Sequence, residues 1–279
     1  MSAVMAVVWR VAVATVGILL GLLIASVAPA QVPPVEPAVE PAVEAVVDPD
    51  GPGGELPISG LSFDGGDGAN ASSSALNFAT SDFAVGAWVK PGSVTANQIL
   101  IAKRNSGGGT AGWRLYLSDN KVGFLFDAAG LNYYFSAAGV VSIGTWTHVV
   151  VAADRDGNLV LYLNGVATTT GDFPADISGK TATVSNTNAL GFGQVTGLVP
   201  YTGILVNPFG MNRLPTAGEI SNLMTAMTPE NSGIVGLWNQ PGYGTSWTDV
   251  VSGYSATFLA GAAAPTWVRY TSIGSGGPQ

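Results

Sequence analysis

Oxygen-bearing side chains stand close together in the stretch FDGGDGAN, where Asp64, Asp67 and Asn70 are separated by glycine and alanine. Calcium takes about six to eight oxygen ligands, and loop carboxylates, amides and backbone carbonyls can supply them. The stretch therefore predicts a calcium site built on Asp64 and Asp67. A tight turn that uses the same side chains also explains the pattern, so both interpretations stay open.

A second alternating set of acids and amides, Asp154, Asp156 and Asn158, lies in the stretch VVVAADRDGNLVLYLNGV. A calcium loop of the helix–loop–helix type needs glycine at its sixth position. That position is Leu159 here, while Gly157 stands fourth. Asp-Gly between two alternating apolar runs is a strong signal for a β-hairpin, so we predict a solvated hairpin tip without a metal.

Ligand-binding groups are sought where aromatic faces meet polar loops, because sugar rings stack on aromatic side chains. The loop KRNSGGGTAG is the longest polar insertion and contains Arg104 and Asn105. Tyr133 and Tyr134 are adjacent, so one of them must point outward if they lie on a strand. We predict that Arg104, Asn105 and one of these tyrosines line any ligand surface.

Residues for the common hydrolytic mechanisms are scarce. Glycoside hydrolysis needs two carboxylates that flank one bond, yet residues 57–279 contain only the glutamates Glu219 and Glu230, and no predicted strand carries acids two or four residues apart. His148 is the single histidine, no Gly-x-Ser-x-Gly motif accompanies it, and cysteine is absent. The sequence therefore predicts a protein without catalytic activity, disulfides, or zinc sites of the thiolate or multi-histidine type.

The elements that must position these residues are short apolar runs separated by Gly, Asn, Asp and Ser. Their spacing of about 8–15 residues predicts an all-β sandwich or barrel rather than βαβ units. One helix is expected at PTAGEISNLMTAM, where Thr216 and Glu219 have the spacing of a capping box. The predicted strands are LSF, FAVGAWVK, QILIAK, WRLYLS, KVGFLFDA, NYYFSA, WTHVVVAAD, NLVLYLNGV, ATVS, ALGFG and GILVNPFG.

Two segments precede the predicted sandwich. Residues 1–30 contain an apolar run after Arg10 and end in SVAPA, which predicts either a cleaved signal peptide or a retained membrane anchor. Residues 31–56 repeat PVEPAVE and carry six acids without an aromatic residue, which predicts an extended, disordered linker. Either interpretation of the first segment places the rest of the chain outside the cytoplasm.

Several motifs together resemble the laminin-G-like, concanavalin A-type jelly-roll domains of bacterial and phage proteins. They are LSFDGGDGANASSSALNFATSDFAVGAWVKP, GWRLYLSDNKVGFLFD, GTWTHVVVAADRDGNLVLYLNGV and YTGILVNPFGMNRLPTAGEI. The resemblance implies two stacked antiparallel sheets, a structural role for His148, and core positions for Trp88, Trp113 and Trp146. In relatives a calcium site can join the opening loop to acids of the closing strand, and here Val206 and Asn207 stand at those positions.

The segment GIVGLWNQPGYGTSWTDVVSGYSATFLAGAAAPTWV is similar to edge strands that flank such domains, which extends the predicted domain over residues 57–268, with a flexible tail over 269–279. Such domains commonly bind carbohydrate or protein. We therefore expect an exported or membrane-anchored module that recognises a glycan or surface polymer. The alternative is a structural or attachment protein of a virion or envelope. A nucleic-acid partner is not expected, because the net charge is −8 and no Lys/Arg cluster occurs.

Overall fold

The described part of the chain belongs to one compact unit, residues 43–279. The predicted segment 1–30, the linker apart from two residues, and the end of the tail lie outside the described residues. Met227 at the end of the predicted helix, Glu230 after it and Tyr243 of the C-terminal segment lie outside them as well. The computed structural model describes residues 46–47, 58–94, 97–106, 110–225, 233–239, 244–259 and 264–270.

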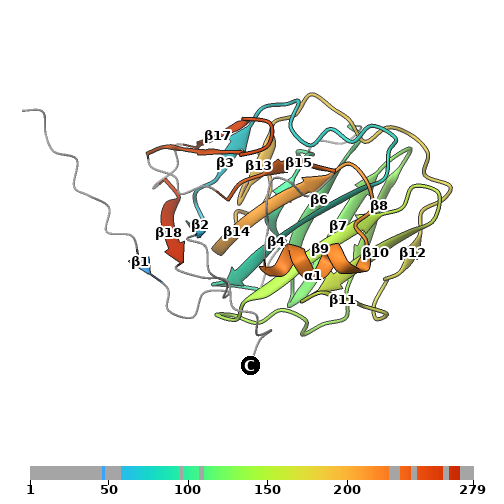
Figure 1. Cartoon of the computed structure of the whole chain (residues 1–279), viewed down its shortest axis with the longest axis horizontal. Coiled ribbons are helices and arrows are strands. Elements are labelled where there is room, and N and C mark those ends of the chain that lie inside the picture. Colours follow the sequence, from blue (N-terminus) through green and yellow to red (C-terminus); the bar gives the residue numbers. More distant parts are fainter. Residues whose placement is uncertain are drawn as a thin grey trace, which may run out of the picture. The chain divides into compact units, whose positions relative to one another are not determined.

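The first of two sheets, sheet A, has ten strands in the order β1-β18-β2-β14-β4-β9-β10-β11, with β12 paired to β10 and β15 to β14 (Figure 1). All of its pairings are antiparallel except that of β1 with β18. The strands of sheet A are β1 (Val46–Val47), β2 (Ile58–Asp64), β4 (Phe83–Pro91), β9 (Thr147–Ala153), β10 (Asn158–Leu163), β11 (Val166–Ala167), β12 (Ala175–Asp176), β14 (Thr202–Met211), β15 (Ile234–Leu237) and β18 (Thr266–Tyr270).

The second sheet, sheet B, has eight antiparallel strands in the order β16-β17-β3-β13-β5-β6-β7-β8. Its strands are β3 (Ala69–Ala71), β5 (Gln98–Ala102), β6 (Gly112–Ser118), β7 (Lys121–Asp127), β8 (Leu131–Phe135), β13 (Leu190–Phe192), β16 (Ser246–Thr248) and β17 (Ser255–Phe258). The predicted all-β, two-sheet jelly-roll sandwich with one short helix is confirmed. The run ATVS, which was expected to be a strand, lies in irregular backbone.

Alternation along the strands explains why the two sheets stack. On β4, Phe83, Val85 and Ala87 face sheet B and join the main apolar cluster. On β6, Trp113 and Leu115 face back toward them from sheet B, and Trp113 lies with its ring centroid 6.2 Å from that of Phe83. Because successive side chains of a strand point to opposite faces, the residues between these positions occupy the outer faces of the sandwich.

The outer face of sheet A is covered by the helix α1 (Ala217–Thr225). Ile220 and Leu223 of the helix pack on Phe209 of β14. The Trp88 indole Nε1 donates to the carbonyl of Met224 at 3.1 Å, which attaches the end of the helix to β4. Within the part of the chain that the structure describes, no helix is long and apolar enough to cross a membrane.

The start of α1 confirms the predicted capping box. The Thr216 Oγ1 accepts from the Glu219 backbone N–H at 3.3 Å, and Glu219 Oε2 accepts from the Thr216 N–H at 2.8 Å. Arg213 adds a two-pronged ion pair to the Glu219 carboxylate, with distances of 2.9 and 2.5 Å. The hydrogen bonds from Arg213 and Thr216 lower the pKa of Glu219 to about 2, so the carboxylate is held charged at the helix N-terminus.

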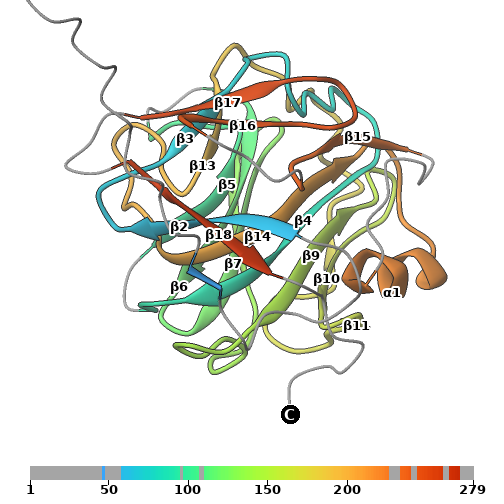
Figure 2. The ribbon, with the colours of Figure 1, turned by 60° about the vertical axis from the view of Figure 1, so that its left-hand side comes forward.

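The C-terminal segment adds strands to both sheets, as its sequence predicted (Figure 2). β16 and β17 form the end of sheet B beside β3, while β15 pairs with β14 and β18 with β2 in sheet A. β18 continues to Tyr270, two residues past the predicted end of the domain. Val46 and Val47, inside the predicted linker, form the short strand β1 against Val268 and Arg269.

Two buried cations hold the loops between the sheets. Lys103 is 0% exposed, and its Nζ donates to the carbonyls of Ser73 and Asn188 at 2.5 Å each. Arg155 is also buried, and its guanidinium donates to the carbonyls of Ala79, Lys180 and Ala182. Both side chains therefore link carbonyls of separate loops through buried, charge-assisted hydrogen bonds.

The stretch DRDGN is the predicted hairpin tip between β9 and β10. Ala153 pairs with Leu159, and the Gly157 N–H donates to the Asp154 carbonyl at 3.1 Å. The Asp154 carboxylate accepts from the N–H of Asp156 at 3.1 Å, inside the turn. Its oxygens are thus used to shape the hairpin.

Candidate functional site

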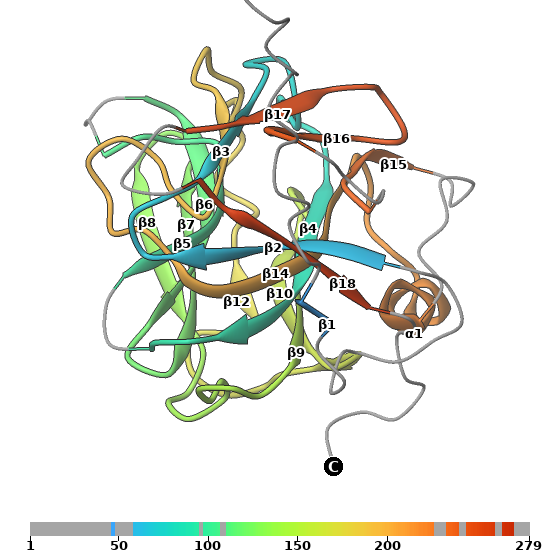
Figure 3. The same cartoon turned by 90° about the vertical axis from the view of Figure 1, so that its left-hand side faces the viewer.

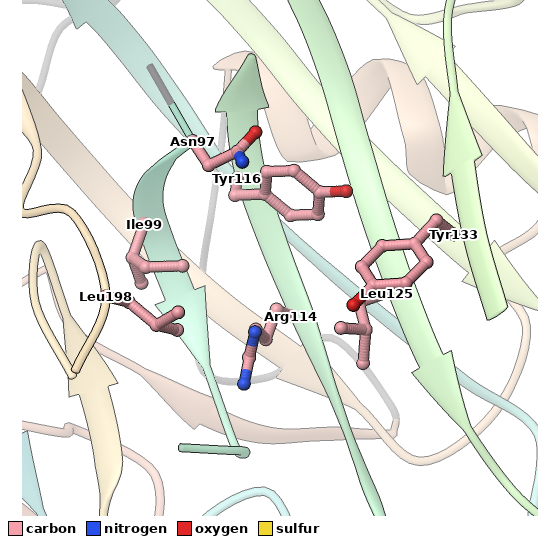
Figure 4. Close-up of a pocket in the computed structure, with 7 residues that line it drawn as sticks. All are labelled: Asn97, Ile99, Arg114, Tyr116, Leu125, Tyr133 and Leu198. Carbon is pink, nitrogen blue, oxygen red and sulfur yellow. The ribbon is translucent and has the colours of Figure 1, made fainter. Parts of the chain in front are cut away.

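A pocket of about 160 Å³ opens on the outer face of sheet B (Figure 4). This face lies on the opposite side of the sandwich from α1, as Figure 3 shows for β6, β7 and β8. The pocket combines one guanidinium, two phenol rings, one amide and three aliphatic side chains. The residues that line it are Asn97, Ile99, Arg114, Tyr116, Leu125, Tyr133 and Leu198.

Strand alternation brings the pocket residues to one face. On β6 the residues Trp113, Leu115 and Leu117 point into the core, which turns Arg114 and Tyr116 outward. The ring of Tyr116 lies directly on Gly123 of β7, its cross-strand partner. A Cβ atom added at Gly123 would come within 2.5 Å of the ring atoms. Glycine at this position therefore provides the space in which the tyrosine ring lies flat.

Tyr116 and its neighbours form a small apolar cluster on this face. The ring of Phe135 meets that of Tyr116 edge-on, with centroids 5.9 Å apart. Ile99 and Leu125 pack in the same cluster, and Leu198 from the loop after β13 packs against it. Burial raises the pKa of the Tyr116 phenol, so the group is a neutral hydroxyl at physiological pH.

Arg114 lies at the base of the pocket and is held by backbone carbonyls. Its Nε donates to the Arg104 carbonyl at 2.9 Å, and its Nη2 donates to the Asn105 carbonyl. Burial, together with the nearby charge of Arg104, lowers the pKa of Arg114 to about 10. The guanidinium is therefore fully charged at neutral pH while being largely removed from water.

Arg104 and Asn105, the predicted ligand residues of the polar loop, lie beneath the pocket and do not line it. Arg104 is 3% exposed, and its Nε and Nη2 each lie 3.1 Å from the Asp127 carboxylate. The Asn105 amide nitrogen donates to Asn188 Oδ1 at 3.2 Å, and its carbonyl accepts from both arginines. Their role here is to position Arg114, because a buried cation needs partners in its immediate surroundings.

The two adjacent tyrosines point to opposite sides of β8, as the strand geometry predicted. Tyr133 is 52% exposed and lines the pocket across from Arg114, with its hydroxyl on the side of the ring that faces the guanidinium (Figure 4). Tyr134 packs against the core cluster, and its ring lies 6.4 Å from that of Phe173. Tyr133 is thus the tyrosine available to a ligand, and Tyr134 is partly buried against the core.

Asp64 and Asp67 meet at the turn that leads from sheet A to sheet B. The Asp64 N–H donates to Asp67 Oδ1 at 3.0 Å, and the Gly66 N–H donates to Asp64 Oδ1 at 2.8 Å. Burial raises the pKa of Asp67 to about 6, with the charge of Asp64 adding to the effect. Among the described residues no three acidic or histidine side chains gather as a metal site would require, so calcium at this turn stays a prediction.

His148 lies on the covered outer face of sheet A. It is 0% exposed and sits between Trp88, at 5.0 Å between ring centroids, and Phe209, at 6.4 Å. Neither ring nitrogen has a hydrogen-bond partner among the residues described. Burial lowers the pKa of His148 to about 3, so the ring is neutral and packs as an apolar side chain, as the sequence indicated. Trp88, Trp113 and Trp146 are likewise buried.

A second hollow, of about 200 Å³, lies between the loop before β4 and the C-terminal segment. Two of its polar side chains are already paired: the Asn77 amide donates to the carbonyls of Ser73 and Asn186, and the Ser252 hydroxyl donates to the Val235 carbonyl. Because a ligand would have to replace these bonds, the pocket on sheet B is the stronger candidate.

Arg114 and Tyr116 were not among the residues predicted from the sequence. The signal for them was present in WRLYLS, where polar-tipped residues alternate with Trp113, Leu115 and Leu117. Such alternation places Arg114 and Tyr116 together on the face opposite the core. Polar loops do not reveal a site that is built on the middle of a strand.

Solved structures of other proteins resemble this chain. A putative carbohydrate binding protein from Bacteroides ovatus matches with a TM-score of 0.61 and 15% identity, over 78% of this chain. The match spans 62% of that protein's length.

Two further similar structures cover almost the whole of the other chain. A SAP-like pentraxin from Limulus polyphemus has a TM-score of 0.48 and 17% identity, over 73% of this chain and 94% of that one. The CBM40 of the Ruminococcus gnavus IT-sialidase bound to alpha2,3 sialyllactose has a TM-score of 0.46 and 20% identity, over 59% of this chain and 96% of that one.

The sequence itself matches no curated protein. Its residues 63–221, more than half of the chain, match the Laminin G family of the concanavalin A-like lectin/glucanase superfamily. These residues run from the end of β2 into α1 and include the strands that build the pocket. The two-sheet sandwich and this match show that the chain belongs to the concanavalin A-like lectin/glucanase superfamily.

Proposed function

We propose that this protein is a non-catalytic carbohydrate-binding module and that the pocket on the outer face of sheet B is its binding site. The observation that carries the proposal is the pairing of Tyr116 and Tyr133 around a charged Arg114 in one open pocket. Aromatic rings provide apolar surface for a sugar ring, while the polar groups between them fix its orientation.

The shape of the site supports a fixed binding surface. Tyr116 is held by Gly123 beneath it and by Phe135 at its edge. Arg114 is held by two carbonyls. Because these side chains are already ordered, little conformational entropy remains to be lost when a ligand binds.

Binding without catalysis is favoured by the groups in the pocket. The described residues of its lining include no carboxylate and no histidine, whereas glycoside hydrolysis uses a pair of carboxylates about the scissile bond. Glu219 is bound to Arg213 at the start of α1. His148 is enclosed on the outer face of sheet A, away from the pocket. A ligand in this pocket would be held without a general acid beside it.

The proposal includes a place outside the cytoplasm, with residues 1–30 serving as a signal peptide or anchor and residues 31–56 as a spacer. The sequence of the first segment supports this location. Intact-mass measurement of the native protein tests it: loss of residues 1–30 indicates secretion, and their retention indicates anchoring. Recovery in the cytoplasmic fraction would contradict the proposed location.

Glycan-array screening of the full chain tests the binding proposal, and it is run with calcium and with a chelator. The variant Tyr133→Ala removes the exposed ring of the pocket. We expect it to lower affinity for the bound glycan by about 10- to 100-fold, since a stacked ring contributes roughly 1–3 kcal/mol. Val166→Ala is the matched control, because Val166 is an exposed apolar residue on β11 of the other sheet.

Three outcomes would contradict parts of the proposal. One is the absence of glycan binding together with copurification in virus or envelope particles, which would favour the structural or attachment role. Another is glycan binding that Tyr133→Ala leaves unchanged, which would place the site elsewhere on the sandwich. The third is release of sugar from a bound β-glucan, which would show that the module is an enzyme.

A further inference from the structure

We propose that the pocket on sheet B selects acidic glycans, with the ligand carboxylate bound by the guanidinium of Arg114. This inference rests on the proposed function and adds the chemical class of the ligand. It is carried by hydrogen-bond donors and a positive charge that the protein leaves uncompensated at the base of the pocket.

Arg114 has hydrogen-bond donors that the described part of the protein does not use. A guanidinium has five N–H groups. Nε is bonded to the Arg104 carbonyl and Nη2 to the Asn105 carbonyl. Nη1 donates to no group in the described part of the chain, and the side chain lines the pocket. Because these donors lie in a site of reduced water access, an acceptor supplied by a ligand would form strong, charge-assisted hydrogen bonds.

The charges around Arg114 do not balance. The guanidinium groups of Arg104 and Arg114 lie close together, since both donate to the Asn105 carbonyl. Asp127 is the carboxylate near both of them, and it is paired with Arg104 at 3.1 Å. Two cations and one anion leave a net positive charge at the pocket, and a ligand carboxylate would neutralise it.

The remaining lining residues suit a sugar that carries such a group. Tyr116 and Tyr133 offer aromatic surface, and Asn97 offers an amide at the rim (Figure 4). The volume of about 160 Å³ equals that of roughly five water molecules, enough for one sugar ring but below the size of a drug-sized ligand pocket. The structure therefore favours recognition of one acidic residue within a longer glycan.

A glycan array that carries each acidic glycan beside its carboxyl-reduced counterpart tests the inference on the unmodified full chain. We expect binding to the acidic members and at least tenfold weaker binding to their neutral partners. Equal binding to both members of the pairs would overturn this inference and leave the proposed function intact. Absence of binding to every glycan would contradict the proposed function, and this inference with it.

Calorimetric titration of the best acidic glycan and its reduced form then locates the selectivity. Arg114→Gln should weaken binding of the acidic form by about 10- to 100-fold, as expected for loss of a hydrogen bond to a charged group. It should weaken binding of the reduced form much less than binding of the acidic form, whereas Tyr133→Ala should weaken both to a similar degree. Equal losses for both forms in Arg114→Gln would overturn the assignment of Arg114.

Arg155→Gln is the matched control for Arg114→Gln. Arg155 is also buried and also donates to backbone carbonyls, but its guanidinium lies over the ring of Phe126 and is absent from the pocket lining. Its substitution should leave the acidic preference unchanged. Thermal unfolding of each variant establishes that it is folded, and the comparison on the unmodified chain decides the question if Arg114→Gln does not fold.

Discussion

The two outer faces of the sandwich are built from the same kind of strand but are used differently. On sheet A the outward residues are covered by the protein itself, with α1 packed on Phe209 and with His148 enclosed between aromatic rings. On sheet B the outward residues Arg114, Tyr116 and Tyr133 line an open pocket. The outward-facing side of a strand is therefore structural or functional according to what covers it.

This difference separates stability from binding. Substitutions under α1 should alter the free energy of unfolding and leave ligand affinity unchanged in the folded protein. Substitution of Tyr133, the exposed residue of the pocket, should do the opposite.

The largest effect is expected for Phe209→Ala on the covered face. Phe209 is completely buried and contacts His148 as well as the cluster under α1. Removing a buried aromatic ring costs about 3–5 kcal/mol through lost burial and a residual cavity. Chemical denaturation measures this loss, and glycan titration below the unfolding transition should give the original affinity. A change in affinity larger than a few-fold would show that the two faces are coupled.

The native protein should lose stability in acid because of the buried His148, and this loss is the second largest effect expected. Because the native pKa is lowered from 6.5 to about 3, the unfolded chain binds a proton between these values while the native protein does not. The native state therefore loses stability as pH falls below 6.5, by about 1.4 kcal/mol for each pH unit well inside the window. Between pH 6.5 and about pH 4.5 the loss should be roughly 2–3 kcal/mol.

The variant His148→Leu isolates this contribution. Its unfolding free energy should lack the His148 component of the slope in that window, while all other titrating groups are shared with the original protein. The difference between the two denaturation curves, measured at several pH values, reports His148 alone. Identical slopes for the two proteins would mean that the ring is accessible to protons in the native state.

A smaller effect is expected at the crossing between the sheets, where Asp67 is 1% exposed. Its native pKa is raised from 3.8 to about 6, so the native state binds a proton that the unfolded chain has lost. Stability from this group is complete at low pH and falls as pH rises through that window. Asp67→Asn should therefore raise stability by about 1–2 kcal/mol above pH 7 and by little near pH 4.

Bound calcium would make the charged Asp67 carboxylate favourable, so that Asp67→Asn would lower stability instead of raising it. A bound cation favours the charged carboxylate, so added calcium should raise the melting temperature of the original protein more than that of Asp67→Asn. The measurement is thermal unfolding at pH 7.5 with chelator and with calcium. Lower stability of Asp67→Asn in chelator would show that the carboxylate is stabilised by the protein itself.

The smallest expected effect comes from Gly123→Ala, which sharpens the comparison because it alters the pocket from below. The new methyl group would come within 2.5 Å of the Tyr116 ring and displace it. We expect about tenfold weaker glycan binding, or roughly 1.4 kcal/mol, together with a loss of stability of about 1 kcal/mol from overpacking. Gly179→Ala is the control, because a methyl group there meets no atom within 4 Å. Unchanged affinity in Gly123→Ala would show that the position of Tyr116 does not matter for the ligand.

The sequence predicted the sandwich well because its signals are local. Alternation in WTHVVVAAD and NLVLYLNG, with Asp-Gly between them, predicted the β9–β10 hairpin. The spacing of Thr216 and Glu219 predicted the start of α1. Edge additions were harder to foresee, because the two-residue strand β1 depends on a partner, Val268–Arg269, that lies more than 200 residues away.

The candidate site was predicted only in part. Strand geometry predicted that one of Tyr133 and Tyr134 points outward but not which one, and the choice of Arg104 depended on its place in a polar loop. The fold brings Asp127 to Arg104 from another strand, and this ion pair removes Arg104 from the surface. A long-range partner of this kind leaves no trace in the local sequence, so which of two nearby arginines faces a ligand is decided by the tertiary structure.

The buried cations Lys103 and Arg155 have a consequence for the conditions under which the protein works. Both are bonded to backbone carbonyls. Dissolved ions screen exposed charge pairs strongly and buried contacts much less. The loops that these residues hold should therefore keep their arrangement from dilute buffer to concentrated brine.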